Sequence, residues 1–173
     1  MKWQNITLAA TLGTLFVFGG VANTYAQSET IGKDRAAAIA QERMNGAIPI
    51  EIDFDRAKGQ DAYEVAFANG TDVYVGKRTG DVLKVERYND TDRSDRRVAR
   101  VAAQTPDRIG FSQAAITSQQ AAGGDVVGVE LGLENGQLVY EVDLTGDTYV
   151  YVWAVSGEIY EIEQDDWDYD DWE

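Results

Sequence analysis

The chain has 173 residues, a formal net charge of −15, and neither cysteine nor histidine. These absences exclude disulfide staples, thiol or imidazole catalysis and ordinary zinc sites, so carboxylates are the main reactive side chains left. The negative charge argues against nucleic acid and against an anionic membrane as partners.

The first 26 residues have the layout of a secretory signal peptide. Lys2 precedes an interrupted apolar stretch over 6–21, and Thr24-Tyr25-Ala26 is typical of a cleavage site. The stretch is shorter than the roughly 20 residues that a membrane span needs, so retention as an anchor is the less favoured alternative. No Cys follows it, which excludes a lipid anchor at that place. We therefore expect a periplasmic or secreted protein that begins near Gln27, with no stable membrane insertion.

The rest of the chain contains an internal repeat. GQDAYEV at 59–65 returns as GQLVYEV at 136–142, and Val-Tyr-Val at 73–75 returns at 150–152. The match runs from 37 to 86 without a gap at an offset of 77 positions. A solenoid unit has only about 20–50 residues, so this offset indicates a duplicated small domain.

The two halves carry different charge. Residues 27–107 contain 13 basic and 15 acidic side chains, whereas residues 108–173 contain 1 basic and 15 acidic side chains. The net charges are therefore about −2 and −14, which indicates two units with different surfaces.

In the first copy, a stripe of apolar residues at helical spacing predicts a helix that ends at Asn45-Gly46. Alternating segments over 48–55 and 62–68 predict two strands, the Val-Tyr-Val triplet a third, and the residues after Gly80 a short fourth. Alternation assigns Tyr63 to the core and Glu64 to the outer face.

Between the copies, Ser94 is the expected N-cap of a helix that runs to about Gln104. Like charges four residues apart on this helix repel one another by about 0.2–0.5 kcal/mol per pair. One interpretation is a solvated linker helix with Asp92 and Asp95 as local partners. The other is a helix that docks on an acidic surface, in the second copy or in another protein. The arginines concerned are Arg93, Arg96, Arg97 and Arg100.

In the second copy, we expect Ser112 to cap a helix that ends at Gly123-Gly124, with Phe111 and Ile116 forming a hydrophobic staple. Four strands follow as in the first copy, over 126–133, 138–144, the Val-Tyr-Val triplet and a short fourth segment, and Tyr140 is assigned to the core.

The third strand of the second copy carries a row of aromatic residues. If Val150 and Val152 face the core, then Tyr149, Tyr151 and Trp153 share the opposite face, where the first copy has only Tyr74 as a matching aromatic residue. Monomers rarely leave such a patch exposed. Either another part of the chain covers the row, or the row binds a protein or peptide.

The sequence therefore predicts an α+β fold with two small repeats, each a helix packed on an antiparallel sheet of three or four strands. The expected segments are a signal peptide (1–26), repeat one (27–88), a basic linker helix (89–107), repeat two (108–164) and an acidic aromatic tail (165–173).

A helix with Ala-Ile, then x-Tyr-Glu-Val, then a Val-x-Val strand that closes on Thr-Gly-Asp or Ser-Gly-Glu resembles the PepSY family in both copies. The resemblance implies a cystatin-like architecture and a link to secreted metallopeptidases, whose propeptides contain such domains and inhibit or assist the enzyme. The first copy departs from the pattern at Lys77-Arg78, where the family often has an acidic residue, and the second at Trp153-Ala154-Val155.

The tail DDWDYDDWE mimics the first ligands of an EF-hand loop, but Asp171 replaces the required glycine and no bidentate Glu follows. An EF-hand is excluded, and weak Ca²⁺ binding remains an alternative. The aromatic residues instead favour a short segment that docks on a basic, apolar surface, for which the linker arginines are an internal candidate. These aromatic residues are Trp167, Tyr169 and Trp172.

Catalysis has little support, because Glu64 and Glu141 lie mid-strand and no second carboxylate is placed at the separation of about 5–10 Å that glycoside hydrolysis needs. We expect an exported, non-catalytic protein without a cofactor that regulates or inhibits a secreted or periplasmic peptidase. The alternative is a periplasmic binder of Ca²⁺ or small cationic ligands through the acidic second half.

Overall fold

A computed structural model of the chain describes residues 30–89 and 92–164. The expected signal peptide and the acidic aromatic tail lie outside the described residues. The described chain has an α+β fold, as the sequence predicts, with three helices and eight strands. The elements in chain order are α1 (Lys33–Arg43), β1 (Pro49–Ala57), β2 (Gln60–Phe67), β3 (Thr71–Gly76), β4 (Val82–Arg87), α2 (Arg93–Ala103), α3 (Phe111–Ala122), β5 (Val126–Glu134), β6 (Gln137–Leu144), β7 (Thr148–Trp153) and β8 (Ile159–Gln164).

All eight strands belong to one antiparallel sheet with the order β4-β3-β2-β1-β5-β6-β7-β8. Each half contributes a four-stranded meander, and the two meanders join where β1 pairs with β5. The seam is short, with Glu51 opposite Glu130, Ile52 opposite Val129 and Asp53 opposite Gly128. The sequence did not predict this junction, which turns two small sheets into one continuous surface.

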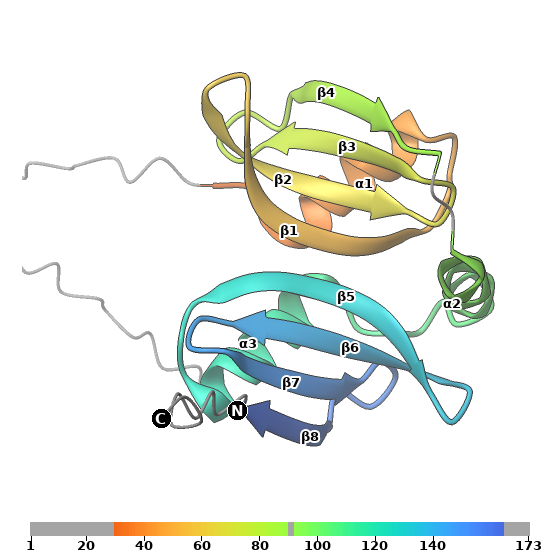
Figure 1. Cartoon of the computed structure of the whole chain (residues 1–173), viewed down its shortest axis with the longest axis vertical. Helices are drawn as coiled ribbons and strands as arrows, with labels where there is room; N and C mark the ends of the chain where they lie inside the picture. The colour runs from red at the N-terminus through yellow and green to blue at the C-terminus, as the bar shows by residue number, and fades with distance from the viewer. Residues whose placement is uncertain (1–29, 90–91, 165–173) are drawn as a thin grey trace, which may run out of the picture.

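Helices α1 and α3 both lie against the same face of the sheet, behind it in Figure 1. They pack small residues onto the apolar strand faces, since Ala36 and Ala40 of α1 and Ala114 of α3 are fully buried. Tyr63 and Tyr140 are buried as predicted, and each hydroxyl donates a hydrogen bond to the carbonyl that precedes a helix, Ile31 and Ile109 respectively. Each tyrosine therefore ties its helix start to the sheet.

The strands repeat at the predicted offset of 77, but the helices do not. The buried positions of α1 reappear in α3 at an offset of 78, so Lys33 corresponds to Phe111 and Ala36 to Ala114. The ungapped alignment was therefore wrong over the helices. The second copy has one residue fewer between helix and strand, where Gly123 and Gly124 with positive φ make the turn.

Two predicted helix caps are also wrong. The N-cap of α2 is Asp92, whose carboxylate accepts a hydrogen bond from the Ser94 amide, so Ser94 lies within the first turn. Helix α3 begins at Phe111 after Gly110, so Ser112 is already helical. The hydrophobic staple does not form either, because Phe111 is buried in the helix while Ile116 is exposed.

Candidate functional site

We call the face of the sheet opposite α1 and α3 (Figure 1) the open face, and the strand register places carboxylates on it in both halves. Cross-strand pairing places Glu51 of β1 beside Glu130 of β5, and Glu130 beside Glu141 of β6. On the other side of β1, Asp53 pairs with Glu64 of β2. The row that contains Glu64 continues through Tyr74 and Lys84, with the pair Asp72 and Glu86 beside it, and the row that contains Glu141 continues through Tyr151 and Glu161. The open face therefore carries carboxylates from both halves, with Lys84 and the aromatic residues of β7 among them.

The seam is built so that these carboxylates crowd together. Gly128 lies opposite Asp53, and a Cβ at residue 128 would collide with the Asp53 carboxylate. Crowding and partial burial disfavour the charged form. Burial, followed by repulsion from Asp53, raises the pKa of Glu51 to about 8, and burial with the neighbouring Asp72 raises the pKa of Glu64 to about 7.

The same cause acts in the second half. Burial raises the pKa of Glu130 and of Glu141, and the neighbouring carboxylates Glu141 and Glu163 add to it respectively. The surroundings therefore favour the protonated form of open-face carboxyl groups in both halves, most strongly at Glu51 and Glu64.

The predicted aromatic row lies at one side of the open face. Tyr149, Tyr151 and Trp153 of β7 are half-buried and face the same side. The Tyr151 hydroxyl donates a hydrogen bond to Glu163, and the Trp153 ring packs against Tyr160 with their centroids 4.8 Å apart. Strand β8 therefore supports the row from its edge and leaves part of each ring accessible.

Tyr74 lies on the open face as predicted, opposite Glu64, but little of its side chain is accessible to a partner. Its side chain is only 5% exposed and lies in a separate small cluster with Ala57, Ala62 and Leu83. The small alanines and the bulge that admits Leu83 let the ring lie flat on the strand face. Its hydroxyl donates a hydrogen bond to Glu86.

The arginines of the linker are brought together by α2, whose apolar side is buried through Val98 and Ala102. Arg93, Arg96, Arg97 and Arg100 are all exposed on the other sides. Helix α2 crosses the end of the sheet near the β5–β6 turn (Figure 1). Arg96 and Arg100 also line a groove of about 580 Å³ between α2 and the β2–β3 turn.

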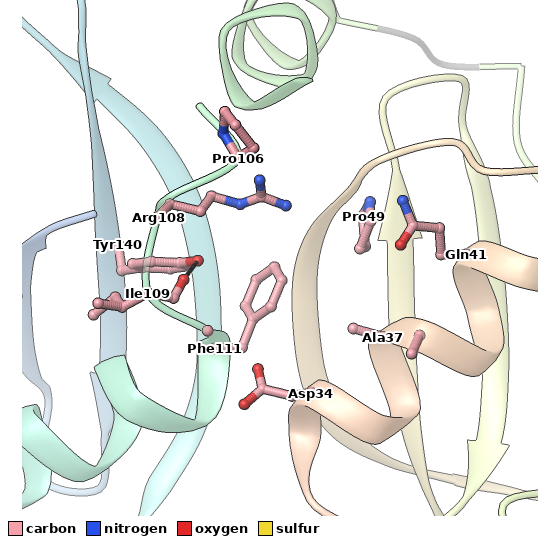
Figure 2. A pocket seen from close by; sticks show the side chains of 11 residues that line it. Asp34, Ala37, Gln41, Pro49, Pro106, Arg108, Ile109, Phe111 and Tyr140 are labelled. Atoms are coloured by element: carbon pink, nitrogen blue, oxygen red, sulfur yellow. Dashed lines mark hydrogen bonds between the residues drawn. The ribbon is translucent and has the colours of Figure 1, made fainter. Parts of the chain in front are cut away.

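The two helix starts meet at the centre of the molecule, beside a pocket of about 210 Å³ that Figure 2 shows. The N-caps Gly32 and Gly110 have no side chain to offer, so each helix borrows an acceptor from the other. The Ser112 amide donates to Asp34 Oδ1, and the Asp34 amide donates to Ser112 Oγ, both at 3.2 Å. A side chain at Gly110 would collide with Asp34.

This exchange of caps makes the pocket a structural joint rather than a ligand site. Arg108, which lines it, donates hydrogen bonds to the Ala102 and Thr105 carbonyls and thereby holds the turn after α2. The Asp34 carboxylate already occupies the place at the start of α3 where an anion would bind.

Three further observations concern metal binding, membrane spanning and the tail. Within 30–89 and 92–164, no group of three or more acidic side chains is arranged to hold a metal ion. In the same ranges, no helix is long and apolar enough to cross a membrane. The tail aromatics Trp167, Tyr169 and Trp172, predicted as partner contacts, lie outside the described residues.

Sequence reasoning placed Glu64 and Glu141 on the outer face and went no further. It did not predict which carboxylates lie beside these two residues, because the rows cross from one half to the other where β1 pairs with β5. The alternation of Glu51 and Asp53 with apolar neighbours was the available signal, but it does not reveal which edges of two small sheets meet.

Comparison with known proteins adds the family. A model described as "Peptidase propeptide and YPEB domain", PepSY, matches residues 30–86 and 108–173. Among solved structures, the chain is similar to a crystal structure described as "a putative lipoprotein" from Clostridium difficile 630, with a TM-score of 0.53 and 18% identity over 78% of this chain and 93% of that chain. A search of curated proteins gave no match.

The structural likeness supports the fold alone, since the identity is low. The family model matches twice, and the two matched ranges each contain one helix followed by four strands of the sheet. With both halves matched, the chain belongs to the PepSY family.

Proposed function

We propose that the chain is an exported, non-catalytic interaction protein that regulates a secreted or periplasmic peptidase, and that its partner binds the open face beside the aromatic row. The observation that carries this proposal is the eight-stranded sheet, on which α1 and α3 pack against the same face and, among the described residues, leave the opposite face open. On the open face, the half-buried Tyr149, Tyr151 and Trp153 lie beside the carboxyl groups of the second half. Aromatic rings beside charge are typical of protein interfaces.

The family supports a peptidase as the class of partner. PepSY domains are linked to peptidase propeptides, and a propeptide acts by contact with its enzyme. The raised pKa values of the open-face carboxylates favour such a contact, because a carboxyl group that keeps its proton is less costly to remove from water than a carboxylate. The proposal includes export by the signal peptide expected over 1–26, with repeats over 27–88 and 108–164, a linker helix over 89–107 and a tail over 165–173.

The test is an inhibition titration with a thermolysin-type metallopeptidase. We expect the protein that begins at Gln27 to change peptidase activity at micromolar concentration, and we expect the triple variant Tyr149→Ser, Tyr151→Ser, Trp153→Ser to lose at least tenfold in apparent affinity. Each of these side chains is partly exposed on β7, so circular dichroism should show that the variant stays folded.

The matched control is Arg35→Ser with Arg43→Ser on α1, which changes two exposed arginines on the helix side of the sheet. It should act on the peptidase like the unmodified protein. Equal potency of the triple variant would exclude the aromatic row as the contact. No effect of the unmodified protein on peptidase activity would exclude this peptidase class as the partner.

A further inference from the structure

Two lysines lie against one phenylalanine on the helix side of the first half. The Nζ atoms of Lys33 and Lys77 each lie 3.9 Å from the centroid of the Phe54 ring, and both lie within 5.6 Å of the Tyr63 ring centroid. Lys33 is only 5% exposed, and within the part of the chain that the structure describes its Nζ has no hydrogen-bond partner. The Phe54 ring itself is 41% exposed.

A buried ammonium group without an acceptor is costly, so this arrangement lacks an anion. Burial lowers the pKa of Lys33 to about 8, and Lys77 contributes repulsion, whereas Asp53 acts in the opposite direction. Arg56 and Arg78 line one pocket with Asp61, and Arg56 forms an exposed ion pair with Asp61 at 3.8 Å. We call this group of residues the basic end: Lys33, Phe54, Arg56, Lys58, Lys77 and Arg78.

The matching positions of the second half are apolar and closed. Phe111, Leu131 and Ala154 stand where the first half has Lys33, Phe54 and Lys77, and none of the three is more than 4% exposed. The end of the second half is covered by the segment that follows β4, because Val101 and Thr105 line the same pocket as Leu138, Trp153 and Val155. The segment that follows the fourth strand of the first half therefore closes this end of the second half.

The same relation links the basic end to residues 165–173, which follow the fourth strand of the second half. In Figure 1, β8 ends on the side of the sheet where the β1–β2 turn lies, away from α2. Four strand spacings separate β8 from β1, about 19 Å in all, whereas nine extended residues span up to about 30 Å. The segment DDWDYDDWE supplies what the basic end lacks, namely carboxylates and aromatic rings.

We propose that residues 165–173 dock on the basic end of the same chain, with their carboxylates paired to Lys33, Lys77 and Arg78 and an aromatic ring packed on Phe54. The linker arginines, which the sequence offered as the internal partner, lie on α2 at the opposite end of the sheet. This docking is independent of the proposed function, since it uses the helix side of the first half and leaves the open face free.

The test uses the tail's own tryptophans. In the protein that begins at Gln27, Trp153→Phe leaves Trp167 and Trp172 as the only tryptophans. Their fluorescence should lie at shorter wavelength than in the urea-unfolded chain, and iodide should quench it at least threefold less. Lys77→Glu with Arg78→Glu should shift the emission to the unfolded value, and a further change of Asp168, Asp170 and Asp171 to Lys should restore it.

The matched control is Arg93→Glu with Arg97→Glu on α2, which should leave the emission unchanged. If the α2 variant releases the tryptophans and the Lys77/Arg78 variant does not, the basic end is excluded as the docking site. An emission equal to that of the unfolded chain before any charge change overturns the proposal, as does a blue shift that vanishes on dilution, which assigns the segment to a second copy.

Discussion

The two halves of the sheet build the same corner from opposite chemistry. In the second half, Phe111 packs edge-on against Tyr140 with 5.3 Å between ring centroids, over buried Leu131. In the first half, Lys33 takes the place of Phe111 and lies over Phe54, next to Tyr63. Both tyrosines keep the hydrogen bond to the residue before the helix. Both halves thus keep the same hydrogen bond to the backbone, whereas only the second half has an apolar side chain at the first position of the helix.

This contrast shows where the fold tolerates charge. In the second half the corner residues Phe111, Leu131 and Tyr140 are all buried, so they serve stability. The turn after α2 lies beside them, since Pro106 and Arg108 line a pocket with Phe111 and Tyr140. The first half leaves Phe54 exposed and surrounds it with cations. A position that one copy uses for packing is available for binding in the other, and exchanging residues between the copies measures the difference.

The largest expected effect comes from moving the lysine into the closed corner. Phe111→Lys removes a buried ring and buries a charge among Leu131 and Tyr140, which should cost about 3–5 kcal/mol in the free energy of unfolding. Urea denaturation followed by circular dichroism measures it. The reverse exchange, Lys33→Phe, should change stability by less than about 1 kcal/mol, because it removes a poorly solvated charge beside an open ring. Similar losses from both exchanges would contradict the distinction between the corners.

A smaller effect is expected where the two halves depend on each other. Asp34→Ala and Ser112→Ala each remove one of the exchanged helix caps, and each should cost about 1 kcal/mol. Because both caps hold the same pair of helix starts, the double variant should deviate from the sum by about 0.5 kcal/mol or more. Asp92→Ala removes the local cap of α2 and serves as the control. Its cost should add to that of either single variant, and coupling as large as that between Asp34 and Ser112 would argue against a specific joint.

Periodicity was enough to predict the strands and the buried tyrosines, because alternation along a strand assigns each side chain to a face. It was not enough for the helix offset, since the alanines of α1 and α3 match almost equally well at 77 and at 78 positions. Nor could it show that Tyr74 is buried, which depends on the small side chains of Ala57 and Ala62 across the strands and on a bulge at Leu83.

The candidate site was the hardest part to predict from the sequence, because it too depends on contacts between strands. Residues of the open face are read correctly strand by strand, but their crowding arises at the seam, where only three residue pairs join the halves. Local patterns specify which face a residue takes. Which strand becomes its neighbour is decided by tertiary pairing, and at this seam Gly128 makes the room that Asp53 needs.

The smallest expected effect on stability concerns Glu51 at the seam, where the second half has Gly128 at the matching position. Because the pKa of Glu51 is raised to about 8 in the folded state, the folded protein binds more protons than the unfolded chain between roughly pH 4.5 and 8. Stability from this group is therefore complete below pH 4.5 and is lost as the pH rises through 8. Glu51→Gln should match the unmodified protein at pH 4 and be more stable by about 1 kcal/mol at pH 9, a modest value because solvent screens the partly exposed face.

Thermal unfolding at both pH values measures this difference, with Glu42→Gln as the control on an exposed position of α1. The control should follow the unmodified protein at both pH values. A Glu51→Gln variant that is no more stable at pH 9 would mean that Glu51 ionises without cost, and the carboxylates at the seam would then be solvated like ordinary surface groups. A gain in stability confined to high pH would instead show that Glu51, at the junction of the two halves, pays for losing its proton in the folded state.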